Sequence, residues 1–211
     1  MIFLSTALPG AYLIHPQPHG DERGSFVRTW CQQEFAAHGL TDLPVQTSVS
    51  YNHRRGTLRG MHWQAAPHAE SKMVRCTRGA IYDVIIDLRP DSPTFMGWIG
   101  LELSWLNRAQ LYVPKGCAHG FQTLEDNTEV SYQISELYAP EAGRGVRYDD
   151  PAFSINWPLP VRAISSQDRM WPDFLRPTAQ STSDRCGPGS DAACVQESSL
   201  RPIPTVVAPN M

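Results

Sequence analysis

The chain has 211 residues, the usual length of one globular domain and enough to bury a sizeable core. Its 18 Lys and Arg residues against 21 Asp and Glu give a formal net charge of −3, which argues against a nucleic-acid or acidic-membrane partner recognised by bulk electrostatics. No apolar run approaches the roughly 18 residues of a membrane span, and residues 1–16 lack the basic stretch of a secretory signal. We therefore expect a soluble, cytoplasmic protein.

The first predicted element is a short helix over residues 32–38. Gly39 follows it, at the position after a helix where the left-handed conformation favours glycine. This helix precedes a long region with a different pattern.

Between Ser48 and Trp157 the sequence alternates short β-prone runs with turn residues. Residues 74–76 and 80–88 flank Arg78-Gly79, which predicts a hairpin because glycine can take positive φ. Further strands are predicted at Trp98–Ser104, Gln110–Val113, 120–124 and 128–135. Repeated short strands at this spacing are typical of an all-β sandwich or barrel.

The composition changes near Arg176. Residues 177–211 are rich in Ser, Pro, Ala and Thr, contain no aromatic residue and show no helical or strand periodicity. Such a segment cannot bury enough apolar surface to offset its ordering entropy. The sequence thus predicts a folded domain over residues 1–176 and a disordered tail over 177–211.

Two segments concentrate polar side chains inside strand-like sequence. The first is Arg59-Gly60-Met61-His62-Trp63-Gln64, followed by Lys72, and the second is Pro114-Lys115-Gly116-Cys117-Ala118-His119-Gly120-Phe121, followed by Tyr132 and Tyr138. If strands around both segments line one barrel, residues of matching parity point inward. In that case His62, Lys72, His119 and Tyr132 converge in a small-molecule pocket.

The histidines and cysteines do not predict a metal centre. The pattern Pro114-x-Gly116-x-x-His119 resembles the second motif of the cupin superfamily, small jelly-roll barrels that often bind a metal. The first motif of metal-binding cupins carries a His-x-His pair and a Glu, whereas this chain offers only His62 there. The five cysteines are scattered without a C-x-x-C pair. We expect no metal.

A longer ordered set of motifs is more specific. The motifs span residues 1–176 and include DERGSF (21–26), LRGMHWQ (58–64), KMVR (72–75), GAIYDVIIDLR (79–89), DSPTF (91–95), PKGCAHGF (114–121), Tyr132, YAPE (138–141), DDP (149–151), INWP (155–158) and SSQD (165–168). In this order they resemble the dTDP-4-dehydrorhamnose 3,5-epimerase family of cupin-fold sugar-nucleotide epimerases. The resemblance implies a mainly β fold, a cupin-type double-stranded β-helix or jelly-roll barrel with short peripheral helices.

The resemblance also implies roles for four catalytic residues in the epimerisation of a 4-keto sugar. It makes His62 the base, Tyr132 the proton donor and Asp168 the carboxylate that orients the imidazole, while Lys72 stabilises the enolate. An imidazole titrates near neutral pH, which suits a base. No cofactor is implied, because the ketone is itself the electron sink.

The implied substrate is a nucleotide-diphosphate sugar bound by a homodimer. Arg59 falls at a diphosphate-binding position, where a guanidinium suits phosphate, and Tyr138 at the position that stacks on the base. The substrate-binding residues implied by the family are Arg23, Gln46, Ser48, Arg59, Lys72, His119 and Tyr138. In the family the N-terminal strands cross to the partner subunit.

Four positions depart from the family pattern, namely Arg28, Ser48, Gly143 and Gln167. They leave open which nucleotide and sugar are bound and whether C3, C5 or both are inverted. Two further alternatives remain, a non-catalytic sugar-nucleotide-binding cupin and a metal-dependent cupin oxygenase, which the incomplete histidine set disfavours.

Overall fold

A computed structural model describes residues 1–176. The chain divides into two compact units, Met1–Asp173 and Phe174–Met211, and the two sheets belong to the first. The predicted tail, 177–211, lies outside the described residues, so its disorder stays a prediction. Within residues 1–176 no helix is long and apolar enough to span a membrane.

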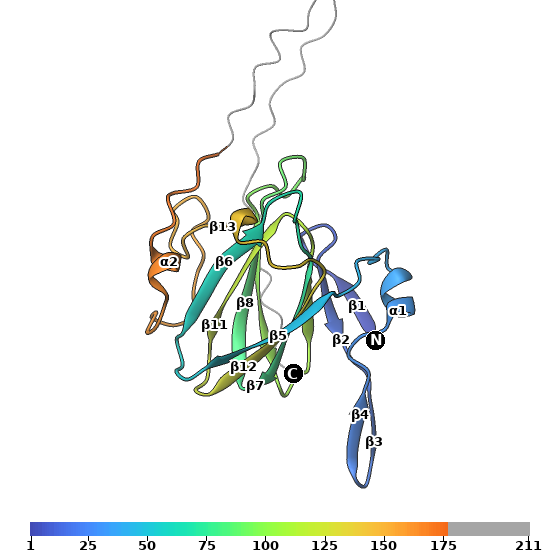
Figure 1. Ribbon diagram of the computed structural model, residues 1–211. Coiled ribbons are helices and arrows are strands. Elements are labelled where there is room, and N and C mark those ends of the chain that lie inside the picture. The colour runs from blue at the N-terminus through green and yellow to red at the C-terminus, as the bar shows by residue number, and fades with distance from the viewer. Residues whose placement is uncertain (177–211) are drawn as a thin grey trace, which may run out of the picture. The chain divides into compact units, whose positions relative to one another are not determined.

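Two antiparallel sheets form the body of the first unit and pack against each other (Figure 1). One has the order β1 (Ile2–Ser5), β2 (Tyr12–His15), β10 (Gln110–Val113), β7 (Lys72–Arg78), β12 (Thr128–Ile134), β5 (Gln46–Asn52). The other has the order β13 (Gly143–Gly145), β6 (Leu58–Gln64), β11 (Cys117–Thr123), β8 (Ala80–Asp87), β9 (Trp98–Ser104). The mainly β jelly-roll class predicted from the sequence is confirmed.

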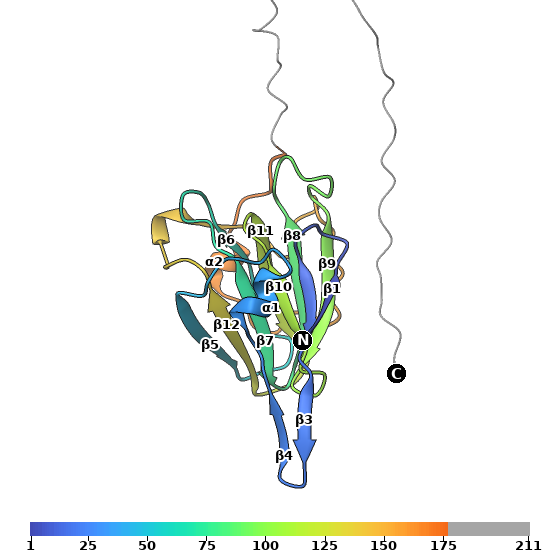
Figure 2. The same ribbon diagram turned by 90° about the vertical axis from the view of Figure 1, so that its right-hand side faces the viewer.

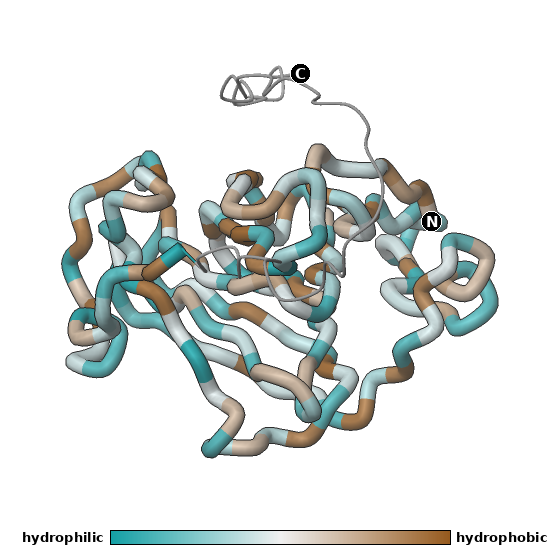
Figure 3. Tube along the Cα trace, turned by 90° about the horizontal axis from the view of Figure 1, so that it is seen from above, coloured by the Kyte–Doolittle hydropathy of each residue, from teal (hydrophilic) through white to brown (hydrophobic). Residues whose placement is uncertain are grey.

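The core lies between the sheets, where inward-facing apolar residues of both meet. Val74 and Cys76 from β7 pack in one buried cluster with Ile81 and Ile85 from β8. Figure 3 shows hydrophobic and hydrophilic residues alternating along the trace, as expected for strands with one face on the core. This packing fixes which side chains point into the barrel.

Most predicted strands are present, with some corrected boundaries. β9 and β10 have the predicted bounds, and Gly79 joins β7 to β8 with φ of 74°. β11 begins at Cys117, three residues before the prediction, because Cys117 to Gly120 continue the ladder with β8. The helix α1 is shorter than predicted, Gln32–Ala36. The strands before β7 and the helix α2 (Ser166–Arg169) are not predicted by the sequence pattern.

Helix α1 covers part of the outer face of the six-stranded sheet. Its Phe35 forms a second buried cluster with Ile14, Met73 and Tyr112, which come from β2, β7 and β10. One side of this sheet therefore faces the barrel while part of the other is covered by the N-terminal region.

A two-stranded hairpin, β3 (Pro18–Asp21) and β4 (Gly24–Val27), projects away from the barrel (Figures 1 and 2). Phe26 on β4 is 77% exposed. The hairpin contacts the barrel through Arg108, which donates a hydrogen bond to Ser25 Oγ at 2.9 Å.

Candidate active site

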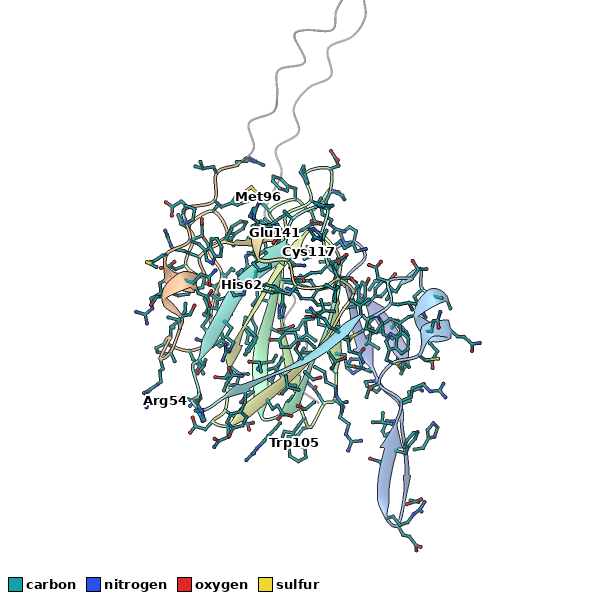
Figure 4. All side chains as sticks on the ribbon, viewed as in Figure 1. Arg54, His62, Met96, Trp105, Cys117 and Glu141 are labelled. Atoms are coloured by element: carbon teal, nitrogen blue, oxygen red, sulfur yellow. The ribbon has the colours of Figure 1, made fainter. Side chains whose placement is uncertain are left out.

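A cavity of about 740 Å³ opens between the two sheets. The five-stranded sheet contributes His62 and His119 to its lining, and the six-stranded sheet contributes Lys72 and Tyr132. Figure 4 shows His62 on β6, between Met96 toward one end of the barrel and Trp105 at the other. The four polar residues that parity placed in one pocket thus lie in one cavity.

A close approach of two glycines brings β6 and β11 together at this cavity. Gly60 has φ of 116°, and a Cβ there would lie 2.5 Å from the Cα of Gly120. Only glycine combines this conformation with this contact. Directly beyond this point the ladder pairs His62 with His119, so both imidazoles reach the cavity from adjacent strands.

His62 forms a charge-capable pair with Asp168. Nε2 of His62 lies 2.6 Å from Oδ1 of Asp168, and the amide of Gly60 donates to Oδ2 at 3.3 Å. Asp168 sits in α2, where its amide donates to the N-cap hydroxyl of Ser165. Burial raises the pKa of the Asp168 carboxyl, but the His62 hydrogen bond and charge, with smaller contributions from Gly60 and Ser165, outweigh burial and hold it below its usual value. The carboxylate is therefore ionised beside the imidazole.

A second histidine–carboxylate pair lies deeper. Nε2 of His119 lies 2.7 Å from Oδ1 of Asp83, and both side chains are almost fully buried. Burial raises the pKa of Asp83, and the neighbouring His119 opposes that rise. The other oxygen of Asp83 has no hydrogen-bond partner among the described residues. The pair fixes the orientation of the His119 ring.

Tyr132 faces these histidines from the opposite sheet. Its ring meets His119 edge to face, with ring centroids 6.0 Å apart. Burial, and next the Asp83 charge, raise the pKa of the Tyr132 phenol, while Arg59 lowers it. Its hydroxyl forms no hydrogen bond within the described part of the chain. A protonated phenol therefore lines the cavity and is free to donate.

The two cations of the cavity are held in different ways. Lys72 Nζ pairs with Glu70 Oε1 at 2.7 Å. Arg59 Nε instead donates to the neutral amide oxygen of Asn52 at 2.7 Å. Asn52 is buried and is itself fixed by a hydrogen bond to the Thr128 carbonyl. Within residues 1–176, Arg59 thus has no carboxylate partner, and its Nη groups at the cavity form no hydrogen bond.

Seven of the predicted site residues line this cavity, namely Ser48, Arg59, His62, Lys72, His119, Tyr132 and Asp168. Three do not line it in this chain. Arg23 lies at the turn of the projecting hairpin and pairs with Asp21, Gln46 is the first residue of β5, and Tyr138 is a 72% exposed loop residue. The loop of Tyr138 is fixed by Gln64, whose amide bonds the Leu137 carbonyl and the Ala139 amide.

Of the four residues that depart from the family pattern, two line the cavity and two lie elsewhere. Ser48 and Gln167 line the cavity. Arg28 instead pairs with Glu34 of α1 at 3.3 Å, and Gly143 pairs with Gln64 on the β6 ladder. Only the first two are therefore placed to contact a ligand within the same chain.

Three residues that support the site were missed. Asp83 has a sequence signal, because it is a charged residue in the middle of the apolar run of β8. Glu70 has a weaker one, as a carboxylate two residues before Lys72. Asn52 has none. Among residues 1–176 no group of three or more His, Cys, Asp or Glu side chains is arranged to hold a metal ion.

Comparison with known proteins identifies the family. The family model of dTDP-4-dehydrorhamnose 3,5-epimerase matches residues 5–175. The dTDP-4-dehydrorhamnose 3,5-epimerase of Sinorhizobium fredii is 43% identical over 179 residues, which cover 82% of this chain and 90% of the relative. The chain belongs to this family. It is thus a member of a family of isomerases.

Solved structures of this family share the fold. The Bacillus anthracis dTDP-4-dehydrorhamnose 3,5-epimerase, with TDP and pyrophosphate bound, superposes with a TM-score of 0.80 at 42% identity and covers 82% of this chain and 99% of its own. ChmJ of Streptomyces bikiniensis, a 3′-monoepimerase in complex with dTDP-quinovose, has a TM-score of 0.74 at 31% identity and covers 80% of this chain and 85% of its own. The solved structures that this chain resembles thus include one described as a 3′-monoepimerase beside one described as a 3,5-epimerase.

Proposed function

We propose that this protein inverts C3 and/or C5 of a nucleotide-linked 4-keto-6-deoxyhexose, with dTDP-4-keto-6-deoxyglucose as the first substrate to test. The observation that carries the proposal is the arrangement across the cavity. An imidazole paired with a carboxylate lies on one sheet, and a phenol with a free hydroxyl lies on the other. The relatives named for this activity support the choice of substrate.

The chemistry requires two proton-transfer groups on opposite faces of the sugar. The C3–H and C5–H bonds flank the C4 ketone, so removal of either proton gives an enolate with its charge on O4. Return of a proton to the opposite face inverts the centre. A cation or hydrogen-bond donor at O4 lowers the barrier.

The residues divide these tasks by position. His62 removes the proton and becomes an imidazolium, which ionised Asp168 stabilises. Tyr132 delivers its phenolic proton from the facing sheet, and the resulting phenolate is reprotonated before the next turnover. Lys72 donates a hydrogen bond to O4 as negative charge develops there, and His119 contacts the sugar from the deeper wall. No cofactor enters this scheme.

The nucleotide diphosphate is proposed to extend toward Arg59 and Ser48. Arg59 offers free Nη groups for bidentate phosphate contact. Arg23, Gln46 and Tyr138 complete the binding set in the proposal. Because Arg23 lies on a hairpin that projects from its own barrel, it serves the cavity of a partner subunit.

The proposed assembly is therefore a homodimer. Exposed apolar side chains support it, with Phe26 on the hairpin and Val49 and Tyr51 on the outer face of β5 at 77%, 61% and 41% exposure. A cytoplasmic location is proposed with it, as expected from the sequence.

A mono-epimerase acting on another nucleotide sugar is the second candidate. ChmJ supports it as a relative that inverts one centre, and Ser48 and Gln167 support it as departures inside the cavity. A non-catalytic sugar-nucleotide binder is the third. Deuterium incorporation from deuterated water into dTDP-4-keto-6-deoxyglucose, followed by NMR, separates them. Exchange with inversion at one or both carbons of this sugar supports the first candidate, inversion of one centre only in a sugar linked to another nucleotide supports the second, and binding without exchange supports the third.

A further inference from the structure

Lys72 is held at the cavity by the carboxylate of Glu70, which is neither the proposed base nor the proposed proton donor. Its ammonium lies 2.7 Å from Glu70 Oε1 and 3.4 Å from the His62 carbonyl. The two paired side chains are only 11% and 9% exposed. Because water is largely excluded, this ion pair differs from the solvent-exposed pairs that contribute little.

The backbone around Glu70 is fixed as well. The amide of Ser71 donates to Ser135 Oγ at 2.9 Å, and the amide of Ser135 donates to the Ser71 carbonyl at 3.1 Å. These bonds tie the start of β7 to the end of β12, the strand that carries Tyr132. Glu70 is thus a rigid anchor for a lysine side chain that otherwise has four rotatable bonds.

The contrast with Arg59 shows what the carboxylate does to the charge of the site. Arg59 is held by the neutral Asn52, so its positive charge remains available to an anion. Lys72 and Glu70 together carry no net charge. An anionic diphosphate is therefore drawn to the Arg59 end, and Lys72 is left to donate a hydrogen bond to a neutral ketone.

We infer that Glu70 is a positioning residue for Lys72, whose ammonium group it aims at the ketone oxygen. This inference rests on the proposed function. It assigns Glu70 no contact with the substrate.

A double-mutant cycle tests the inference. Glu70→Ala is expected to lower kcat for deuterium exchange by roughly 10–10²-fold, as for a misplaced catalytic group, with KM nearly unchanged. Glu70→Gln keeps a hydrogen-bond acceptor and should retain most of the rate. In a Lys72→Ala background Glu70→Ala should have no further effect, because Glu70 acts only through Lys72. Glu136→Gln removes another carboxylate, close to the end of β12, and is the matched control.

A second readout does not depend on activity. The chain has only two lysines, Lys72 and Lys115, and Lys115 pairs with Asp42 at 2.9 Å in a more exposed setting. Lysine labelled with ¹⁵N therefore gives two Nζ signals, assigned by loss of one in Lys72→Ala. The Lys72 signal should shift or broaden in Glu70→Ala, and stay in place in Glu70→Gln and in Asp42→Ala.

The outcomes separate this inference from the proposed function. An unmoved Lys72 signal in Glu70→Ala overturns it whether or not the wild type exchanges deuterium. Equal losses from Glu70→Ala in the wild-type and Lys72→Ala backgrounds overturn it too, since they show a general structural role. If the wild type exchanges no deuterium but the Lys72 signal moves in Glu70→Ala, the result contradicts the proposed function and still supports Glu70 as the anchor of Lys72.

Discussion

The indole of Trp171 lies directly over Gly145, the residue that pairs with His62 on the β6/β13 ladder. A Cβ at Gly145 would overlap the Trp171 ring. Trp171 follows Asp168 by three residues, so this contact holds the chain segment that presents the carboxylate to His62. The packing of one glycine is therefore coupled to the geometry of the proposed base.

Gly145→Ala should displace Trp171 and with it Asp168. We expect a loss of about 1–3 kcal/mol in the free energy of unfolding from overpacking and a fall in kcat of about 10²-fold from misplacement. Chemical denaturation and steady-state kinetics measure the two effects. Gly143→Ala is the control, since its Cβ would meet only the Pro140 carbonyl at 3.2 Å. Equal kinetics in the two variants would contradict the coupling.

Asp168→Asn tests the charge of the carboxylate separately from its position. Asparagine keeps a hydrogen bond to His62 but cannot stabilise the imidazolium, so the rate of exchange at C3 and C5 should fall by roughly 10²–10⁴-fold. The remaining rate should still be higher than that of His62→Ala. Asp173→Asn, which alters an exposed aspartate paired with Arg147, should leave exchange unchanged. Wild-type exchange rates in Asp168→Asn would remove Asp168 from the mechanism.

The environment of Asp87 predicts that the free energy of unfolding falls at acidic pH. Burial raises its pKa, but hydrogen bonds from Arg89, Ser92 and Thr94 outweigh burial and lower it to about 2. A carboxyl group whose pKa is lower in the folded than in the unfolded state stabilises the fold at pH values above its unfolded-state pKa. This stabilisation is lost as the pH falls through the folded-state pKa. The free energy of unfolding should thus drop by about 2 kcal/mol between pH 5 and pH 2 through this group.

Denaturation curves of Asp87→Asn across this range provide the check. The variant should lack this part of the pH dependence, while the exposed Asp91→Asn should keep it. Parallel pH profiles for wild type and Asp87→Asn would show that the network does not depend on the carboxylate charge.

Subunit mixing tests the proposed homodimer and the placement of Arg23. Arg23→Ala should raise KM for the nucleotide sugar, and His62→Ala should abolish turnover. If Arg23 serves the partner cavity, a dimer of one Arg23→Ala and one His62→Ala subunit contains one complete site. At substrate concentrations well below the KM of Arg23→Ala, the mixture should therefore be more active than either variant alone. A monomer by sedimentation, or no recovery on mixing, would count against this assembly.

The sequence predicted local features well where local chemistry decides them. β9 and β10 have the predicted bounds because turn residues flank runs of strand-forming residues. β11 was predicted too short, because a polar His119 inside a buried strand hides its first half from a hydrophobicity pattern. Parity predicted one shared cavity for His62, Lys72, His119 and Tyr132 on the condition that both segments line one barrel, and the four residues do line one cavity.

The spacing of residues along the sequence could not predict contacts between distant segments. His62 and Asp168 are 106 residues apart, and only the family resemblance suggested their pairing. The Glu70 anchor and the Asn52 support of Arg59 depend on how two strands end against each other, which no local pattern records.

The most direct test of the account is a comparison of exchange with inversion in Tyr132→Phe, by NMR in deuterated water with dTDP-4-keto-6-deoxyglucose. The variant keeps His62 and Asp168 but lacks the facing phenolic proton. We predict that deuterium still enters from the original face while inversion falls by roughly 10²–10⁴-fold. Inversion at the wild-type rate in Tyr132→Phe would contradict the assignment of base and acid to opposite sheets.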